Sequence, residues 1–414
     1  METMLQLKIV AFLALTLGSF ALFLFARAKP WERRVLSRLV VAGTLLKFAG
    51  CVLVYVFWPT LIQYSDARNF YLPQTEQLLS GRIPYRDFDT SYSPLFHAFL
   101  APFVSVWHSP GAVVLAMLCV ETATLWLYLR RFRPEESLNA WRCAFLYAFS
   151  PYSVYWVALS GHNGVVIAFC VVLGLVLAER GRAVASGVAA ACALLFTKLL
   201  AMLSWPGIVL FARGGVLRRL WPPIAALALL GAMSAAGADP FESMRQEFHS
   251  STTGNLWFLV TVVVPPLTET EIAPYLPVIA FALAFVPLCV AFARRSDRVS
   301  SRFDAAAAFV AGTNLLFMML SRKAFSFYLV MALLLVLHTI MTTRRPLRYL
   351  APNLYLMAVS WLEETHSTSS HSVVVIETIR ISCYAFLATV CFHASLRMRA
   401  SQKDTPPGSQ RLDA

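Results

Sequence analysis

Charged residues are scarce in this chain. Only 14% of its 414 residues are charged and 58% are hydrophobic, whereas soluble domains average about 25% charged residues. This shortage excludes an ordinary soluble domain. The formal net charge of +13 does not indicate a nucleic-acid partner, because the basic residues lie in short clusters between apolar runs, as in the loops of membrane proteins.

Paired cysteines are also lacking. All eight cysteines lie within apolar runs, and they form no CxxC motif. This arrangement argues against a disulfide framework or a zinc site, and we expect the side chains to pack as small apolar groups. The cysteines are Cys51, Cys119, Cys143, Cys170, Cys192, Cys289, Cys383 and Cys391.

The chain contains instead a series of apolar segments, many near the ~20 residues that cross a bilayer as a helix. Unpaired strand edges are excluded from lipid, so we predict an all-α polytopic membrane protein with about 13 transmembrane helices. The predicted spans are residues 5–26, 39–62, 110–129, 138–159, 164–178, 184–197, 199–212, 220–236, 273–293, 304–320, 324–341, 347–362 and 373–396. Residues 95–108 and 255–267 carry internal prolines, and we expect re-entrant or interfacial pieces there.

Basic residues predict the orientation. Seven clusters of them, the first at 27–38 and the last at 397–403, fall on one side of the predicted spans. The positive-inside rule therefore places the N-terminus outside and the C-terminus in the cytoplasm. The first span is not interpreted as a signal peptide, because its basic residues follow the apolar core. We assign residues 1–403 to one transmembrane domain and 404–414 to a disordered cytoplasmic tail.

The first outer loop, from Gln63 to about Pro94, is much longer than a simple connection, which is typical of a functional loop. We expect a short interfacial helix over 67–80, closed by Gly81. The other predicted outer segments are short or polar. They are 160–163, the pair Thr197-Lys198, 237–254, the turn around Arg322 and Lys323, and the solvated tip 363–372.

The first outer loop resembles the glycosyltransferase-C superfamily, and is most similar to bacterial polyprenol-phosphate-mannose-dependent mannosyltransferases. Weaker similarities extend over about half of the chain, although relatives commonly place this loop after the first span rather than the second. The residues that carry the resemblance are Tyr64-Ser65-Asp66, Tyr71, the run 78–87, Tyr92-Ser93-Pro94-Leu95, Ser150-Pro151, 160–163, Thr197-Lys198 and Phe327-Tyr328.

The resemblance implies that Asp66 is a general base, which deprotonates the acceptor hydroxyl while a polyprenyl phosphate leaves the sugar donor. The alternative is that Asp66 caps a helix. Asp87-Phe88-Asp89 spells a DxD pattern, which favours sugar or structural hydrogen bonding over metal binding; a metal and any cofactor stay unassigned. Arg68 and Arg86 are further candidates for substrate contacts.

Isolated cations in the other outer segments are candidates for binding phosphate. These are Lys198, Arg322 and Lys323, and the alternatives are snorkelling and anchoring of a span end. His162 and Asn163 are candidates for substrate binding, whereas His249 is more typical of a solvated loop histidine. Inside the spans, Lys47, Glu121 and Arg380 either pair with one another or mark a path.

These observations lead to an expected function and two alternatives. We expect a membrane glycosyltransferase that moves a hexose, most simply mannose, from a polyprenyl-phosphate donor to a lipid, glycan or protein acceptor on the extracytoplasmic face. The expected location is a bacterial inner membrane, with the endoplasmic reticulum as the alternative. The competing functions are a transporter or flippase for a lipid-linked saccharide and a non-catalytic assembly partner. Many transporters show internal repeats, and we find none here.

Overall fold

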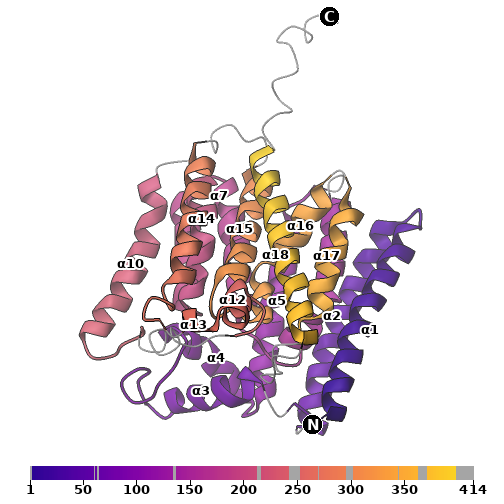
Figure 1. Ribbon diagram of the computed structural model, residues 1–414. Coiled ribbons are helices and arrows are strands. Elements are labelled where there is room, and N and C mark those ends of the chain that lie inside the picture. The colour runs from indigo at the N-terminus through magenta and orange to yellow at the C-terminus, as the bar shows by residue number, and fades with distance from the viewer. Residues whose placement is uncertain are drawn as a thin grey trace, which may run out of the picture.

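The structure is a computed structural model, which describes residues 2–397 apart from residues 60, 63–64, 134–136, 212–215, 242–251, 269, 295–301, 344 and 362–370. The predicted tail at 404–414 and most of the predicted tip at 363–372 lie outside the described residues. The described chain forms a bundle of helices (Figure 1), in which an isolated bridge between Pro84 and Phe88 is the sole β-pairing.

Six of the described helices are long and apolar enough to cross a membrane. They establish a multi-pass, all-α membrane protein, as the composition predicts. The number of about 13 crossings stays a prediction. The six helices are α1 (Glu2–Arg27), α2 (Glu32–Phe57), α5 (Pro110–Arg130), α14 (Leu276–Ala293), α15 (Arg302–Leu320) and α18 (His371–Arg397).

The other α-helices of the described chain are shorter or less uniformly apolar. They are α3 (Leu72–Leu79), α4 (Pro94–Val106), α6 (Ser137–Ala148), α7 (Gly164–Glu179), α8 (Ala183–Leu195), α9 (Trp205–Phe211), α10 (Val216–Ala235), α12 (Leu256–Val263), α13 (Pro265–Thr268), α16 (Leu333–Thr342) and α17 (Pro346–Ala358). Over the segments 67–80, 95–108 and 255–267, the structure has η1 and α3, α4, and α12 and α13, respectively.

Three predicted spans are not continuous α-helices. Residues 138–159 divide at Pro151 into α6 and the π-helix η2 (Tyr152–Val157). Residues 199–212 begin with the 3₁₀-helix η3 (Leu199–Ser204), and residues 324–341 contain the 3₁₀-helix η5 (Ser326–Met331). Irregular backbone at membrane depth persists where protein encloses it or where it lines a cavity. These interruptions therefore point to a site beside them.

The two ends of the bundle differ in content. α3 and α4 lie at the end of the bundle where α1 begins. The C-terminal ends of α1 and α18 lie at the opposite end (Figure 1). The basic residues Arg27 and Arg130 occupy the last turns of α1 and α5. The first outer loop is thus separated from the arginine-rich ends of these helices by the length of the bundle.

A buried polar network ties α2 to α5 and η2. The Lys47 ammonium lies 2.6 Å from a Glu121 carboxylate oxygen and 2.7 Å from the Ser153 hydroxyl, which donates to Glu121 at 2.7 Å. Lys47 and Glu121 therefore pair with each other. Arg380 lies instead 3.5 Å from Glu377 on its own helix. Because an unpaired charge is costly in hydrocarbon, the Lys47 network holds η2 at one depth in the bundle.

All eight cysteines are free thiols.

Candidate functional site

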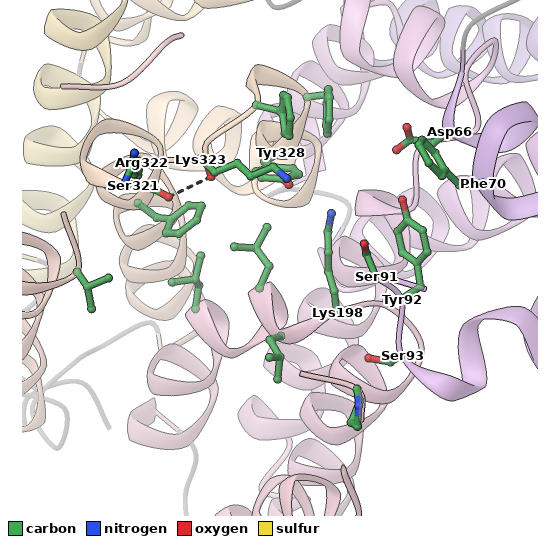
Figure 2. Close-up of a pocket in the computed structure, with 18 of the residues that line it drawn as sticks. Asp66, Phe70, Ser91, Tyr92, Ser93, Lys198, Ser321, Arg322, Lys323 and Tyr328 are labelled. Atoms are coloured by element: carbon green, nitrogen blue, oxygen red, sulfur yellow. Dashed lines mark hydrogen bonds between the residues drawn. The ribbon is translucent and has the colours of Figure 1, made fainter. Parts of the chain in front are cut away.

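A cavity of about 660 Å³ opens between several segments that are far apart in the chain, and three of them carry its charged side chains. The first outer loop provides one wall, from Asp66 to Ser93. Lys198 and the start of η3 provide the floor, and the segment from Ser321 to Tyr328 provides the facing wall. Figure 2 shows Asp66 and Tyr92 on one side of this space, Lys198 rising between the walls, and Arg322 on the other side.

Asp66 precedes the π-helix η1 (Ala67–Tyr71), but its side chain makes no capping hydrogen bond. Its Oδ2 instead accepts a hydrogen bond from the Tyr71 hydroxyl at 3.1 Å and lies 3.4 Å from Nε2 of His162. The Asp66 side chain is 29% exposed, whereas that of His162 is 3% exposed. The Asp66 carboxylate thus contacts Tyr71 and His162 on its buried side and is open to the cavity on the other. These contacts argue against the alternative that Asp66 caps a helix.

The hydrogen bonds of His162 define its tautomer. Nδ1 accepts the Gly164 N–H at 3.3 Å, so the ring proton of the neutral imidazole is on Nε2, the atom that faces Asp66. The ring packs against Phe327, with 4.0 Å between the ring centroids. Burial lowers the pKa of His162, and the nearby Lys198 charge adds to this effect while Asp66 opposes it. His162 is therefore a neutral imidazole whose buried Nε2 faces the carboxylate at 3.4 Å, a close contact without hydrogen-bond geometry.

Asp66 is ionised in this environment. Burial raises the pKa of Asp66, but the contact with His162, the charge of Lys198 and the hydrogen bond from Tyr71 outweigh it, and the pKa falls below the ordinary value. A general base must be deprotonated and within hydrogen-bond reach of the proton that it takes. Because its pKa is lowered, Asp66 is deprotonated at neutral pH. Its exposed edge faces the cavity, where an acceptor hydroxyl can come within hydrogen-bond reach.

Lys198 lies in extended backbone between α8 and η3, with φ −165° and ψ 168°. The Ser93 N–H donates to the Thr197 carbonyl at 2.8 Å, which fastens this segment to the first outer loop. The Lys198 ammonium lies 4.5 Å from the centroid of the Tyr328 ring and 5.8 Å from that of Tyr92. A cation between aromatic faces at a cavity floor is placed to attract an anionic group.

The facing wall carries two further cations. The Arg322 carbonyl accepts hydrogen bonds from the Thr252 N–H at 3.1 Å and the Asn255 amide at 3.2 Å, so the turn after α15 is fixed by the segment before α12. The Arg322 guanidinium lies 5.9 Å from the Trp257 ring. Lys323 lies over Phe325 at 5.6 Å. Lys198, Arg322 and Lys323 thus line one cavity with Asp66, although their segments are distant in sequence.

An apolar groove of about 600 Å³ adjoins the cavity. The two spaces share Leu199, Leu200, Leu203 and Phe317. The groove is lined by apolar side chains from η3, α9, α10, α14 and α15. These helices belong to the apolar part of the bundle, so the groove offers an acyl or prenyl chain an apolar surface next to the cavity that Lys198 and Arg322 line.

The structure places the other predicted site residues away from the cavity lining. Arg68 donates to the carbonyls of Pro59 at 2.7 Å and Ile62 at 3.3 Å, which closes its own loop. Arg86 pairs with Asp87 at 2.9 Å in an exposed position. The hydrogen bond from Arg86, with that from the Ile83 N–H, lowers the pKa of Asp87 to about 2. The Asp89 carbonyl accepts from Gln74 at 3.2 Å.

The metal interpretation of the DxD pattern gains no support. Within the described residues, no group of three or more His, Cys, Asp or Glu side chains is arranged to hold a metal ion. Asn163 is fully buried beside His162 in the chain, and its side-chain amide finds no hydrogen-bond partner among the described residues. His249 lies outside the described residues.

Several cavity residues were not predicted as site residues. Tyr85, Gln74 and Ser91 line the same wall as Asp66, and the Tyr71 hydroxyl holds its carboxylate. Tyr71 and Tyr85 belong to the pattern that resembles the glycosyltransferases, but the pattern alone assigns them no role. Comparison with known proteins adds nothing to these contacts, because neither a protein-family model nor a curated protein matches the chain.

Proposed function

We propose that this protein is an integral membrane glycosyltransferase. It transfers a hexose, most simply mannose, from a polyprenyl-phosphate donor to a lipid, glycan or protein acceptor on the extracytoplasmic face of a bacterial inner membrane. The observation that carries this proposal is the placement of one oriented carboxylate, Asp66, in a cavity that is also lined by three cations and adjoins an apolar groove.

The chemistry assigns Asp66 to the acceptor. Its carboxylate takes the proton of an acceptor hydroxyl as that oxygen attacks the anomeric carbon of the donor. The bond between the anomeric carbon and the phosphate oxygen breaks, and its electron pair leaves with the polyprenyl phosphate. Attack opposite to the leaving group inverts the anomeric configuration and requires one carboxylate. Asp66 is then neutral until it returns the proton to water.

The cations are assigned to the leaving group. Negative charge grows on the phosphate oxygen in the transition state, and fixed cations stabilise such charge strongly in a site that excludes water. Lys198 stands at the junction of the cavity and the groove, since the following residues Leu199 and Leu200 line both. A phosphate at Lys198 therefore leaves its prenyl chain in the groove and its sugar toward Asp66.

Transfer with a defined donor tests this proposal. The purified protein in lipid nanodiscs is incubated with radiolabelled polyprenyl-phosphate mannose and extracted membrane lipids. Wild type is expected to transfer label, and Asp66→Asn to lose transfer by at least about a hundredfold. Asp89→Asn is the matched control, because it removes a carboxylate of the same loop that does not line the cavity. Transfer that persists in Asp66→Asn removes this residue from catalysis.

The same cavity and groove are compatible with a flippase for lipid-linked saccharides. That alternative predicts movement of a labelled lipid-linked sugar across the bilayer of reconstituted vesicles, with no transfer to any acceptor. It also predicts that Asp66→Asn leaves this movement intact, because a flippase requires no general base.

A further inference from the structure

Tyr85 has an unusual backbone conformation. It has φ +68°, and it is the one non-glycine residue with positive φ in the described part of the chain. This region favours glycine, and a bulky aromatic residue is uncommon there. A tyrosine placed where glycine is free of strain points to a use for the ring, since strained residues gather at functional sites.

A short turn holds Tyr85 in this conformation. The Tyr85 N–H donates to the Phe88 carbonyl at 2.9 Å. The Asp87 carboxylate accepts the Ile83 N–H at 2.7 Å and is gripped by Arg86 at 2.9 Å. The Tyr85 hydroxyl donates to the Tyr92 carbonyl. Asp87, the first aspartate of the DxD segment, therefore stabilises the turn, and the turn fixes the Tyr85 ring on the cavity wall.

The wall around Asp66 has a distinct composition. Between residues 66 and 93, the lining side chains are three aromatic rings, one amide, two serine hydroxyls and the Asp66 carboxylate, without a lysine or arginine. They are Asp66, Phe70, Gln74, Tyr85, Ser91, Tyr92 and Ser93. Figure 2 shows Asp66, Phe70, Ser91 and Tyr92 together on this side of the cavity, across from the cations of the facing wall.

Such a wall matches an uncharged pyranose. The C–H face of a sugar ring packs on aromatic rings, and its hydroxyls exchange hydrogen bonds with amides and hydroxyls. The Gln74 side chain has a fixed orientation, because its Oε1 accepts a hydrogen bond from the Thr90 hydroxyl at 2.9 Å and its amide N–H donates to the Asp89 carbonyl. A sugar with a carboxylate or phosphate near the reacting hydroxyl meets the charge of Asp66, and the nearby Lys198 already interacts with that carboxylate.

We propose that this wall is the acceptor subsite, that Tyr85 is its stacking platform, and that the acceptor group it takes is an uncharged pyranose. The assignment of this sugar as the acceptor rests on the proposed transferase function. Binding of the sugar to the wall does not rest on that function, so sugar binding and sugar transfer can be tested separately.

The test measures binding without any donor. Saturation-transfer NMR follows methyl β-glucopyranoside and, as its charged counterpart, methyl β-glucuronide, with the protein in lipid nanodiscs. Tyr85→Asn removes the ring but keeps a residue that tolerates positive φ. Tyr85→Phe keeps the ring. Leu79→Ala is the control, because Leu79 is 45% exposed on the same loop and does not line the cavity.

Wild type, Tyr85→Phe and Leu79→Ala are expected to bind the glucoside saturably, and Tyr85→Asn about tenfold more weakly. The glucuronide is expected to bind wild type at least about tenfold more weakly than the glucoside. If Tyr85→Asn does not fold, Phe70→Ala replaces it, since Phe70 is 48% exposed and lines the same wall.

Three results overturn the inference. They are an absence of glucoside binding to wild type, wild-type affinity in the variant that lacks the ring, and equal binding of the two sugars. None of them depends on catalysis. If the sugar binds as expected but no donor supports transfer, the subsite stands as a sugar-binding wall and the transferase proposal falls.

Discussion

Nε2 of His162 lies 3.4 Å from Oδ2 of Asp66, and the backbone N–H of Gly164 occupies the other ring nitrogen of His162. The imidazole is therefore unable to accept the acceptor proton on either nitrogen while it stays neutral in this tautomer. In the proposed transferase, this relationship assigns the role of base to Asp66 and a positioning role to His162. The arrangement also explains why a buried histidine sits at a cavity whose lining does not include it.

The role of His162 predicts a graded effect of substitution. His162→Gln retains an N–H donor of similar reach, whereas His162→Ala removes the donor and leaves the carboxylate free to rotate. We expect His162→Ala to lower kcat of sugar transfer by about ten- to a hundredfold, because misplacement of a catalytic group by about 1 Å has that scale of effect. His162→Gln is expected to retain most of the rate. Equal loss in both variants contradicts a positioning role.

Removal of the Lys198 charge is expected to change the pH dependence of sugar transfer. Burial raises the pKa of Asp66, and His162, Lys198 and Tyr71 together lower it more. Removing the Lys198 charge therefore raises the pKa of Asp66, and on acidification the active carboxylate is lost at a higher pH. The acid limb of a plot of kcat/KM against pH is expected to move to higher pH in Lys198→Met.

The same variant is expected to bind the donor about ten- to a hundredfold more weakly, since it loses a charge-assisted hydrogen bond to phosphate. Lys29→Met is the control for net charge, because Lys29 follows α1 at the opposite end of the bundle. An acid limb that stays in place, or moves equally in the control, argues against an electrostatic contact between Lys198 and Asp66.

The coarse architecture follows from composition, but the site depends on tertiary contacts. Apolar length and clustered arginines predict the membrane class, and the first outer loop predicts Asp66 as a candidate. Lys198 is predicted because an isolated charge is costly between apolar runs, and Arg322 and Lys323 because separated cations in an outer turn can bind phosphate. All three line the cavity with Asp66.

Other features are not predicted from residue type, even where their contacts are local. Asp87 is a neighbour of Arg86 in sequence as in space, so its carboxylate is used within the turn rather than for substrate. The positive φ of Tyr85 follows from a hydrogen bond to Phe88 and from the turn that Asp87 stabilises, which residue type does not encode. The interruption of residues 138–159 coincides with Pro151, which is visible in the sequence, but the contact of Lys47 with Ser153 of η2 joins residues more than a hundred positions apart.

The conformation of Gly161 predicts how sensitive the contact between Asp66 and His162 is to a change in the backbone. Its φ is +69°, and a Cβ there would lie 3.0 Å from the Ala67 Cβ, one residue from Asp66. Gly161→Ala is therefore expected to push the segment that carries His162 away from η1, with a stability loss of about 1 kcal/mol and a larger relative loss of transfer. Gly231→Ala is the control, because nothing lies within 4 Å of its Cβ position. Unfolding and transfer are measured for both variants, and an unchanged rate in Gly161→Ala contradicts close coupling of the two segments.

The groove predicts a dependence on the length of the donor chain. Leu203 lines both the cavity and the groove, and a tryptophan there fills the passage between them. A long prenyl chain must occupy the groove for its phosphate to reach Lys198, whereas a donor with a short alkyl chain needs little of it. Leu203→Trp is therefore expected to raise KM for the long-chain donor by about tenfold or more and to change KM for the short-chain donor little, since each buried CH₂ contributes about 0.8 kcal/mol. Leu283→Trp adds the same ring to α14 at a side chain that is 72% exposed and lines neither space. A KM that rises equally for both donors places the new ring at the phosphate and not along the chain, and a KM that does not rise for either donor excludes the groove as the path of the lipid.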